Sequence, residues 1–377
     1  MSFKFTIYAL LLPIVKDVIV NIYFRVFNIL LTSVKRFLSA FFLFVRLISI
    51  FVFILINRKE MNKNPGKNDW LVIVNPNSGN GKGKKDWMHI SSVLEKQGLI
   101  WSEDFTERKG HAISLTKEAI AVGYRKILCV GGDGTLNEIV NGVFNQNITP
   151  TGDITLGIIP VGTGNDWGRM FGIPLNYEGA IQIIKDEKTM LHDIGSVTYY
   201  NGPVKSERYF INIAGLGFES VVVKRTNVQK DNGKSGKAIY FYNLLMSLIS
   251  YKNTKAEIFI DGNRTEANIF SLNVGNGKYC GGGMRQTPFA VPDDGILDVT
   301  IIKGMGKIEI IMNLKILYDG SILDHPKVEG HKCKNVIVRS DSVLYVEADG
   351  ESLGHTPAEF NIIPSCINIV YGTRIIQ

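Results

Sequence analysis

Short apolar runs alternate with amphipathic stretches between residues 66 and 195. Trp70–Val74 (WLVIV) is rich in β-branched residues, which is typical of a buried strand. Similar runs follow at Ile127–Val130 and Leu156–Val161, and Trp101–Thr106 is a plausible further strand. Helical patterns separate these runs, at residues 87–94, 112–122 and 136–143. Strands that alternate with helices predict a doubly wound parallel α/β domain over residues 66–195.

Three glycine-rich turns fall where predicted strands end. They are residues 75–85 (NPNSGNGKGKK), 131–134 (GGDG) and 162–166 (GTGND). In such sheets ligands bind beyond the carboxyl ends of the strands. Glycine lets the backbone approach a phosphate closely, and the N–H groups at a helix start favour an anion. One such turn is usually a tight connection, but three together indicate a nucleotide site. Residues 79–84 match neither the GxGxxG fingerprint nor the Walker A loop.

Strand patterns dominate the second half. They occur at Tyr209–Phe218, Ala256–Ile260, Ala267–Asn273, Leu297–Ile302, Val336–Val338 and Val343–Glu347. Asp261-Gly262 between two of them is a hairpin signal, and helical patterns interrupt the series at Lys237–Ser250 and Lys307–Tyr318. We therefore predict a β-rich domain over residues 196–360. A strand within residues 361–377, near Ile367–Tyr371, should then return to the first domain or its hinge.

Residues 1–60 form an apolar, basic leader that differs from the rest of the chain. Phe37–Ile56 has 20 residues with one charge, Arg46, and is long enough to span a bilayer. From Asn21 onward, however, polar residues recur at helical spacing, which predicts one narrow polar stripe on a helix lying in the headgroup plane. We expect a helical membrane anchor of one kind or the other. Alternatively, translation starts at Met61 and the leader is a reading-frame artefact.

The charge of the chain is concentrated in this leader. The 377 residues carry a formal net charge of +7. Residues 1–60 contain eight basic and two acidic side chains, which leaves 34 basic and 33 acidic ones for the remainder. The nearly neutral body argues against a nucleic-acid partner, which needs clustered Lys and Arg. The basic apolar leader suits anionic lipid at the cytoplasmic face of a membrane, whereas a start at Met61 would predict a cytoplasmic protein.

Three segments together resemble a known enzyme family. Gly131–Glu138 (GGDGTLNE), preceded by Asn75–Gly79 (NPNSG) and followed by Gly162–Asp166 (GTGND), resembles the catalytic domain of diacylglycerol, sphingosine and ceramide kinases. The size and the later Asp-Gly motifs resemble the bacterial lipid kinases of that family. The resemblance implies a nucleotide-binding domain like that of phosphofructokinases and NAD kinases. It also implies a second domain, a β-sandwich that receives the lipid, and ATP-dependent phosphorylation of a lipid hydroxyl.

The resemblance also implies which residues bind ATP. They are Asn75, Pro76, Asn77, Ser78, Gly79, Thr106, Gly132, Asp133, Gly134, Thr135, Leu136, Asn137, Glu138 and Thr163. Some bacterial members place a Lys directly after NPxSG, whereas this chain has Asn80 there, with Lys82, Lys84 and Lys85 downstream. Which lysine meets the phosphates is therefore open.

Two magnesium sites follow from the same resemblance. In the bacterial enzymes three aspartates form a water-linked magnesium network, and they match Asp133, Asp166 and Asp193, the last opening the next strand. Mg²⁺ prefers oxygen ligands and keeps several waters, so carboxylates bound through water suit it. A structural Mg²⁺ loop matches residues 291–296, with the Asp294 carboxylate and the carbonyls of Val291 and Ile296 as ligands.

Catalysis is assigned to the Asp-Gly-Glu motif near the end of the chain. Asp349-Gly350-Glu351 matches the catalytic motif of the family, with Glu351 as the acceptor of the lipid hydroxyl proton and Asp349 close to metal or substrate. Phosphoryl transfer then needs positioning and neutralisation of charge by Mg²⁺ and cations. The alternatives are a NAD kinase, which shares GGDGT, and a non-catalytic nucleotide-binding membrane module. The acceptor lipid stays open, as does the oligomeric state, for which a homodimer is one candidate.

Overall fold

Four parallel strands form the centre of the first half of the molecule. They are β1 (Trp70–Val74), β2 (Trp101–Phe105), β3 (Lys126–Gly131) and β4 (Thr155–Pro160), in the spatial order β4-β3-β1-β2. The computed structural model describes residues 65–66, 69–231 and 237–373, and the predicted leader lies outside them. The four strands predicted from the apolar runs are confirmed, and their pairing is parallel throughout.

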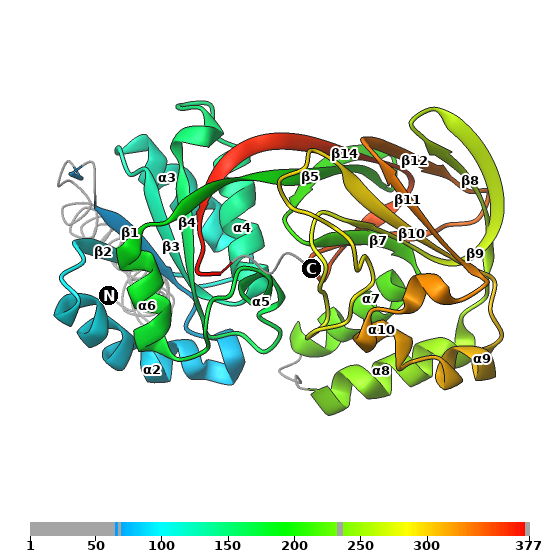
Figure 1. Ribbon diagram of the computed structural model, residues 1–377, viewed down its shortest axis with the longest axis horizontal. Coiled ribbons are helices and arrows are strands. Elements are labelled where there is room, and N and C mark those ends of the chain that lie inside the picture. The colour runs from blue at the N-terminus through cyan, green and yellow to red at the C-terminus, as the bar shows by residue number, and fades with distance from the viewer. Residues whose placement is uncertain (1–64, 67–68, 232–236, 374–377) are drawn as a thin grey trace, which may run out of the picture. The chain divides into compact units, whose positions relative to one another are not determined.

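Helices cover both faces of this sheet (Figure 1). Because side chains alternate along a strand, Leu71 and Ile73 point into a core with α3 (His111–Ala121) and α4 (Asp133–Phe144). Trp70, Val72 and Val74 point into a second core with α2 (Ser78–Lys96) and α6 (Tyr177–Asp186). A short helix, α5 (Asp166–Met170), and a 3₁₀ turn, η1 (Thr151–Asp153), complete this half. The predicted doubly wound arrangement is confirmed.

The second half consists mainly of antiparallel strands around one core. They are β5 (Thr189–Asn201), β6 (Val204–Phe210), β7 (Ile213–Gly217), β8 (Thr254–Ile260), β9 (Asn263–Gly275), β10 (Leu297–Lys303), β11 (Val328–Cys333), β12 (Asn335–Arg339), β13 (Tyr345–Ala348) and β14 (Glu351–Val370). Their inward side chains meet in a cluster that includes Val197, Leu272, Val299 and Phe360. The predicted β-rich architecture therefore fits.

Helices α7 (Phe218–Asp231), α8 (Lys237–Ser250), α9 (Lys307–Met312) and α10 (Ile316–Asp319), with the 3₁₀ turn η2 (Ile322–Asp324), lie along one side of these strands (Figure 1). They enclose a small apolar cluster, to which Phe218, Leu248, Phe270 and Ile310 belong. Among the described residues no helix combines the length and the apolarity that crossing a bilayer requires.

The predicted strand Tyr209–Phe218 is wrong as a single element. β6 ends at Phe210 and β7 begins at Ile213, because the N–H groups of residues 211, 212 and 213 donate to the carboxylate of Asp349 rather than to a neighbouring strand. The Asp261-Gly262 hairpin is confirmed. Both residues have positive φ, 46° and 84°, as a two-residue turn between right-twisted strands requires.

Two further predicted boundaries are corrected. The helix expected over Lys307–Tyr318 is two helices. After Asn313 the backbone bonds span three residues instead of four, as from Leu314 to Ile311 and from Ile316 to Asn313, so the α-helical pattern ends there. The glycine-rich turn is shorter than expected, since α2 includes residues 82–85, although Gly79, Asn80 and Gly81 are left-handed. Asp193 lies inside β5 and does not open that strand.

Two long strands join the halves. β5 and β14 pair antiparallel from Thr189↔Val370 to Tyr200↔His355, and the end of β14 also pairs parallel with β4. Figure 1 shows both strands running from one half into the other. The predicted domain boundaries at 195/196 and 360/361 therefore fall within these strands rather than in linkers. Both halves belong to one compact unit that begins at Pro65.

Candidate active site

The three glycine-rich turns meet in space at the carboxyl ends of β1, β3 and β4. A Cβ atom on Gly162 would lie 2.6 Å from the Cα atom of Gly132, so the two backbones touch. Gly79 has φ +60°, and a Cβ atom there would lie 2.1 Å from the carbonyl oxygen of Val161. Glycine is therefore required at these three positions for the turns to approach one another.

Side chains of the NPNSG and GGDGT segments hold this arrangement. Asn75 donates from Nδ2 to Thr135 Oγ1 at 2.9 Å, and its Oδ1 accepts from the N–H of Asn77 at 3.0 Å. α4 begins here, and a Cβ atom on Gly134 would find no atom within 4 Å, so the first turn of that helix faces open space. A helix start with an open glycine face suits a phosphate, which fits the predicted nucleotide contacts.

The other predicted ATP residues differ in what they can contact. Leu136 is buried in the core, so only its backbone is available to a nucleotide. Glu138 accepts from the N–H groups of Gly110 at 2.8 Å and Ala112 at 3.2 Å, and thus holds the loop between β2 and α3. Thr106 opens that loop and is buried, whereas Thr163 is exposed. Glu138 therefore holds the loop between β2 and α3 in place through its carboxylate.

Asp133 and Asp166 face each other across Gly164. A Cβ atom on Gly164 would lie 3.0 Å from Asp133 Oδ2 and 3.1 Å from Asp166 Oδ2. Asp166 Oδ2 accepts from the N–H of Gly282 at 2.8 Å, but its buried Oδ1 has no hydrogen-bond partner. Burial, and then the charge of Asp133, raise the pKa of Asp166 to about 6. Asp166 Oδ1 also lies 4.0 Å from Arg169 Nε. Two facing carboxylates, one with an oxygen that accepts no hydrogen bond, fit a hydrated Mg²⁺ ion.

Asp193 lies in a different cluster from this pair. Its oxygens accept from the N–H groups of Gly295 and Ser365, both at 2.6 Å, and its own N–H donates to the carbonyl of Pro292 at 2.8 Å. Burial raises its pKa, the bonds from Ser365 and Gly295 oppose that shift, and Asp293 and Asp294 add to it. The structure thus brings two of the three predicted aspartates into direct proximity, and ties the third to residues 291–296.

The loop of residues 291–296 is ordered around Asp294. Its Oδ1 accepts from the N–H of Ile296 at 3.1 Å, and its Oδ2 lies 3.6 Å from Lys332 Nζ. The predicted ligand set needs only one carboxylate here, with backbone carbonyls from Val291 and Ile296. Across the described ranges there is no group of three or more His, Cys, Asp or Glu side chains that could hold a metal.

Asp349 connects the two halves at the catalytic motif. It has φ 47°, and its carboxylate points back into the protein, where Oδ2 accepts from Asn137 Nδ2 at 2.7 Å and from the N–H of Ile211 at 2.8 Å. Oδ1 accepts from the N–H groups of Asn212 at 3.0 Å and Ile213 at 3.1 Å. Burial raises the pKa of Asp349 to about 6, against the effect of these four bonds. Both oxygens are therefore occupied.

Glu351 is partly exposed. Its side chain is 24% exposed, and Oε2 contacts the ammonium group of Lys109, which belongs to the loop after β2. Glu347, two residues before Asp349, is buried and accepts from the N–H of Gly350 at 2.9 Å. Burial raises the pKa of Glu347 well above its ordinary value, and the charges of Asp349, Glu219 and Glu351 add to the shift. Of the predicted catalytic pair, Asp349 has four donors on its two oxygens, whereas Glu351 contacts Lys109 through one oxygen.

Two cations of this region were not predicted from the sequence. Lys109 contacts Glu351, and Arg208 on β6 donates from Nη2 to Asn137 Oδ1 at 2.5 Å. Asn137 in turn donates to Asp349, so Arg208 orients the residue that orients Asp349. Lys109 could have been suspected from its place three residues after Thr106. Arg208 has no such signal, because only the fold brings β6 beside α4.

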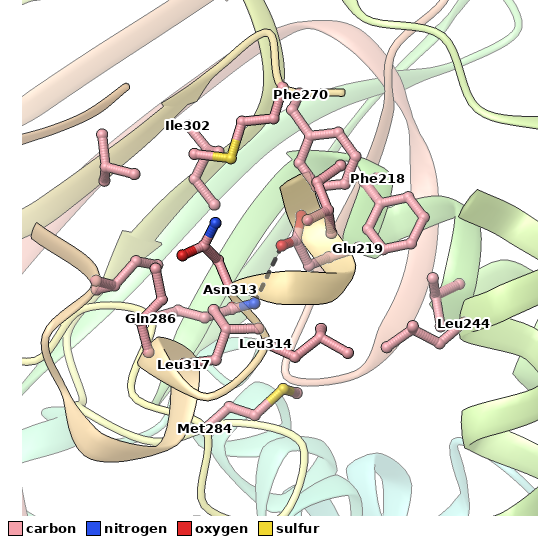
Figure 2. A pocket seen from close by; sticks show the side chains of 16 residues that line it. Phe218, Glu219, Leu244, Phe270, Met284, Gln286, Ile302, Asn313, Leu314 and Leu317 are labelled. Atoms are coloured by element: carbon pink, nitrogen blue, oxygen red, sulfur yellow. Dashed lines mark hydrogen bonds between the residues drawn. The ribbon is translucent and has the colours of Figure 1, made fainter. Parts of the chain in front are cut away.

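A cavity of about 60 Å³ opens among the helices of the second half (Figure 2). Its lining is chiefly apolar and includes Phe218, Leu244, Met284 and Leu314. Glu219 is the charged exception. It accepts from Gln286 Nε2 at 3.1 Å, as Figure 2 shows, and from the hydroxyl of Ser271.

Helix α7 links this cavity to the turn of residues 349–351. Glu219 and Val222 of α7 line the cavity, and Asn227 of the same helix donates from Nδ2 to the carbonyl of Gly350 at 3.3 Å. Burial raises the pKa of Glu219.

Comparisons with known proteins show the family of the chain. Residues 69–197 match the family model "Diacylglycerol kinase catalytic domain", and residues 212–371 match "YegS C-terminal NAD kinase beta sandwich-like domain". A diacylglycerol kinase of Staphylococcus haemolyticus is 32% identical over 291 residues, which are 77% of this chain and 84% of that protein. One of Staphylococcus carnosus is 29% identical over 311 residues, 81% of this chain and 97% of that protein.

A solved structure shares the fold. The crystal structure of a diacylglycerol kinase from Bacillus anthracis is similar with a TM-score of 0.61 and 25% identity, over 82% of this chain and 98% of that one. The chain belongs to the diacylglycerol kinase family and is a lipid kinase. As a kinase of this family it uses ATP as the phosphoryl donor.

Proposed function

We propose that this kinase phosphorylates the free hydroxyl of diacylglycerol, with Glu351 as the acceptor of the hydroxyl proton. One observation carries the assignment of the site. Asp349 accepts a hydrogen bond from Asn137 of the GGDGTLNE segment, which supports a position of Glu351, two residues further on, near the nucleotide half. The names of the similar staphylococcal proteins support diacylglycerol as the acceptor.

Each acidic residue has a separate task in this proposal. Glu351 removes the proton as the hydroxyl oxygen bonds to the γ-phosphorus, and Asp349 fixes the turn that carries Glu351. Mg²⁺, when bound, neutralises charge on the phosphate oxygens. Asp133 and Asp166 would hold that ion through water, with Asp193 supporting the neighbouring loop. A second Mg²⁺ would be held by Asp294 and the carbonyls of Val291 and Ile296.

The apolar cavity of the second half is our candidate for an acyl-chain site. Its lining from α7, α8 and the segment around Leu314 offers the apolar surface that a hydrocarbon chain requires. Glu219 and Gln286 supply polar groups at one end, where a glycerol ester could lie. Helix α7, which lines the cavity and contacts the carbonyl of Gly350 through Asn227, supports a lipid whose hydroxyl reaches Glu351 while a chain occupies the cavity.

We further propose that the protein works at the cytoplasmic face of a membrane. Helices α8 and α9 carry exposed apolar side chains, among them Phe241, Ile249, Ile308 and Met312, with exposed fractions of 53%, 65%, 75% and 78%. The ammonium group of Lys307 contacts the carbonyl of Ile249, so the two helices meet and a cation lies beside the apolar surface. Such a combination suits an anionic bilayer.

The leader would strengthen this attachment. Residues 1–60 would add a net charge of +6 and an apolar segment, as an in-plane helix or as a span. Intact-mass analysis of the native protein tests whether the leader is translated, since a start at Met61 would remove it. The sequence also leaves a homodimer open, which light scattering of the same preparation decides.

One assay tests the proposed activity. The protein is incubated with labelled ATP and Mg²⁺ in parallel with diacylglycerol, a sphingoid base and NAD. We expect label in the lipid phase with diacylglycerol, reduced more than about tenfold in Glu351→Gln, as for loss of a general base. Label on the sphingoid base would replace diacylglycerol as acceptor, label on NAD would favour a NAD kinase, and no label would favour a non-catalytic module.

A further inference from the structure

Lys109 connects the nucleotide half with the predicted proton acceptor. It lies in the loop between β2 and α3, and its ammonium group contacts Glu351 Oε2 on the opposite half. That oxygen is buried beneath the lysine, although the Lys109 side chain itself is 61% exposed. The lysine thus reaches inward from solvent to the catalytic carboxylate.

The loop is positioned independently of this ion pair. Glu138 accepts from the N–H groups of Gly110 and Ala112, at 2.8 Å and 3.2 Å. The N–H of Thr106 donates to the carbonyl of Val74 at 2.9 Å. Gly110 has φ 78°, a left-handed conformation that turns the chain into α3. Hydrogen bonds on both sides of Lys109 therefore hold its backbone at the edge of the site, independently of the contact with Glu351.

Stability alone gives a weak reason for such a contact. An ion pair with one partner this exposed contributes little to the stability of the fold, because solvent screens it. The position matters more, because a hydroxyl that loses its proton to Glu351 must at that moment bond to the γ-phosphorus. A cation in contact with Glu351 consequently lies next to the phosphoryl group being transferred.

We propose that Lys109 contacts the γ-phosphoryl oxygens and is the phosphate-facing lysine of this enzyme. The inference rests on the proposed role of Glu351. In the step, the hydroxyl proton passes to Glu351, the lipid oxygen bonds to the γ-phosphorus, and the bond from that phosphorus to the β–γ bridging oxygen breaks, which releases ADP. Lys109 neither gives nor takes a proton and neutralises charge on the oxygens that move.

The proposal distinguishes Lys109 from the lysines near the first turn. Lys82, Lys84 and Lys85 are exposed residues of α2, beyond the left-handed residues 79–81. Because ADP lacks the γ-phosphate, a lysine that contacts this group improves the binding of ATP and leaves that of ADP nearly unchanged. A lysine on the α- or β-phosphate would improve the binding of both.

The test compares nucleotide binding by calorimetry in the full chain with Mg²⁺. We expect Lys109→Gln to weaken a non-hydrolysable ATP analogue about tenfold and ADP less than about twofold, as for loss of one charge-assisted contact. Arg108→Gln, which removes the neighbouring exposed cation of the same loop, should bind both like the native protein. Lys109→Arg should recover most of the analogue affinity. Melting temperatures verify that all variants are folded.

Three outcomes separate this inference from the proposed function. Equal weakening of the analogue and ADP, or no weakening of either, would overturn the γ-phosphoryl contact. The Glu351→Gln variant gives the second outcome. If Lys109 only held Glu351 in place, this variant would lose the preference for the ATP analogue over ADP, as Lys109→Gln does. If Lys109 contacts the γ-phosphoryl group, the variant should keep that preference. Absence of lipid phosphorylation by the native protein, with the preference intact, would reject the proposed function and keep the phosphate contact.

Discussion

Asp349 and Glu351 are two residues apart in one turn, yet their surroundings differ. Four donors occupy the carboxylate of Asp349, whereas Glu351 has a single cation at one oxygen. A carboxylate whose lone pairs are all used cannot accept a proton without losing a bond. Asp349 is therefore suited to hold the turn, and Glu351 to exchange the proton.

This difference predicts that the two amide variants fail in different ways. Glu351→Gln should lower the turnover of lipid more than about tenfold while the melting temperature stays near the native value. Asp349→Asn should lower both, because its new NH₂ group faces donors such as Asn137 and Ile211 and leaves some of them unpaired. Turnover and thermal unfolding, measured on the same samples, check this, with Glu95→Gln on the surface of α2 as the control. An unchanged melting temperature in Asp349→Asn would contradict the structural role.

Asp104 on β2 makes stability depend on pH. Burial raises its pKa from 3.8 to about 6, helped by Glu118 and opposed by His111, so the folded protein binds this proton more tightly than the unfolded chain. The charged form therefore reduces stability as pH rises from about 4 to 6. Asp104→Asn should raise the free energy of unfolding by about 1–2 kcal/mol at pH 8, and hardly at pH 4. Urea titrations at pH 4 and pH 8 check this. An equal gain in stability at pH 4 would show that the buried charge of Asp104 is not the cause.

Individual residues were predictable from the sequence only where a motif marks them. Asp133, Asp349 and Glu351 each stand in a recognisable segment. Lys109 and Arg208 do not, because their importance comes from partners on the opposite half, Glu351 and Asn137. Contacts between segments that are distant along the chain produce no periodic pattern in the sequence, so they cannot be predicted from it.

The apolar cavity beside α7 and α8 gives a prediction about chain length. Leu314→Trp places a large ring into the lining and should raise the KM for long-chain diacylglycerol several-fold, with little change for ATP or a short-chain lipid. Ile311, 49% exposed on α9, supplies the matched control Ile311→Trp. Assays in mixed micelles check both variants. The same rise in KM for Ile311→Trp, or an equal rise for long-chain and short-chain lipids, would show that the cavity is not the acyl-chain site.

Helices and strands were predictable where burial is regular. The runs that became β1, β3 and β4 are apolar over nearly their full length, as parallel strands covered on both faces must be. The sequence pattern does not predict β11 (VEGHKC), because only Val328 and Cys333 at its ends are buried. It does not predict α7 either, because the first residue of that helix, Phe218, continues the apolar pattern of residues 209–218.

The exposed apolar surface of α8 and α9 gives a prediction about the membrane. Ile308→Gln with Met312→Gln should lower the binding of vesicles that contain anionic lipid about tenfold, because both side chains would have entered the interface. The same pair of changes at Ile148 and Leu175, 56% and 69% exposed on the nucleotide half, is the control. Flotation with vesicles measures the binding. Equal loss in both double variants would show that no particular face is used.

The connection between the halves is only partly predictable from the sequence. The pattern near Ile367–Tyr371 predicts a strand that returns to the first domain, and Asn368 and Ile369 do pair with β4. The boundaries at 195/196 and 360/361, however, divide two continuous strands. The structure instead continues β5 and β14 through both positions, in register from one half to the other. The composition of residues 189–201 and 351–363 does not indicate this continuity, because their strand patterns do not differ from those of strands that stay within one half.

The shared strands have a consequence for how the protein can be divided. A polypeptide that ended after β5 would leave β4 with an open edge, since Asn368 and Ile369 of β14 pair with Thr155 and Leu156. A polypeptide that began after Ile194 would leave the last eight residues of β14 without their antiparallel partner. Neither fragment should fold alone, but the two should restore activity when co-expressed. Fragment complementation thus becomes a practical assay for the assembly of this kinase.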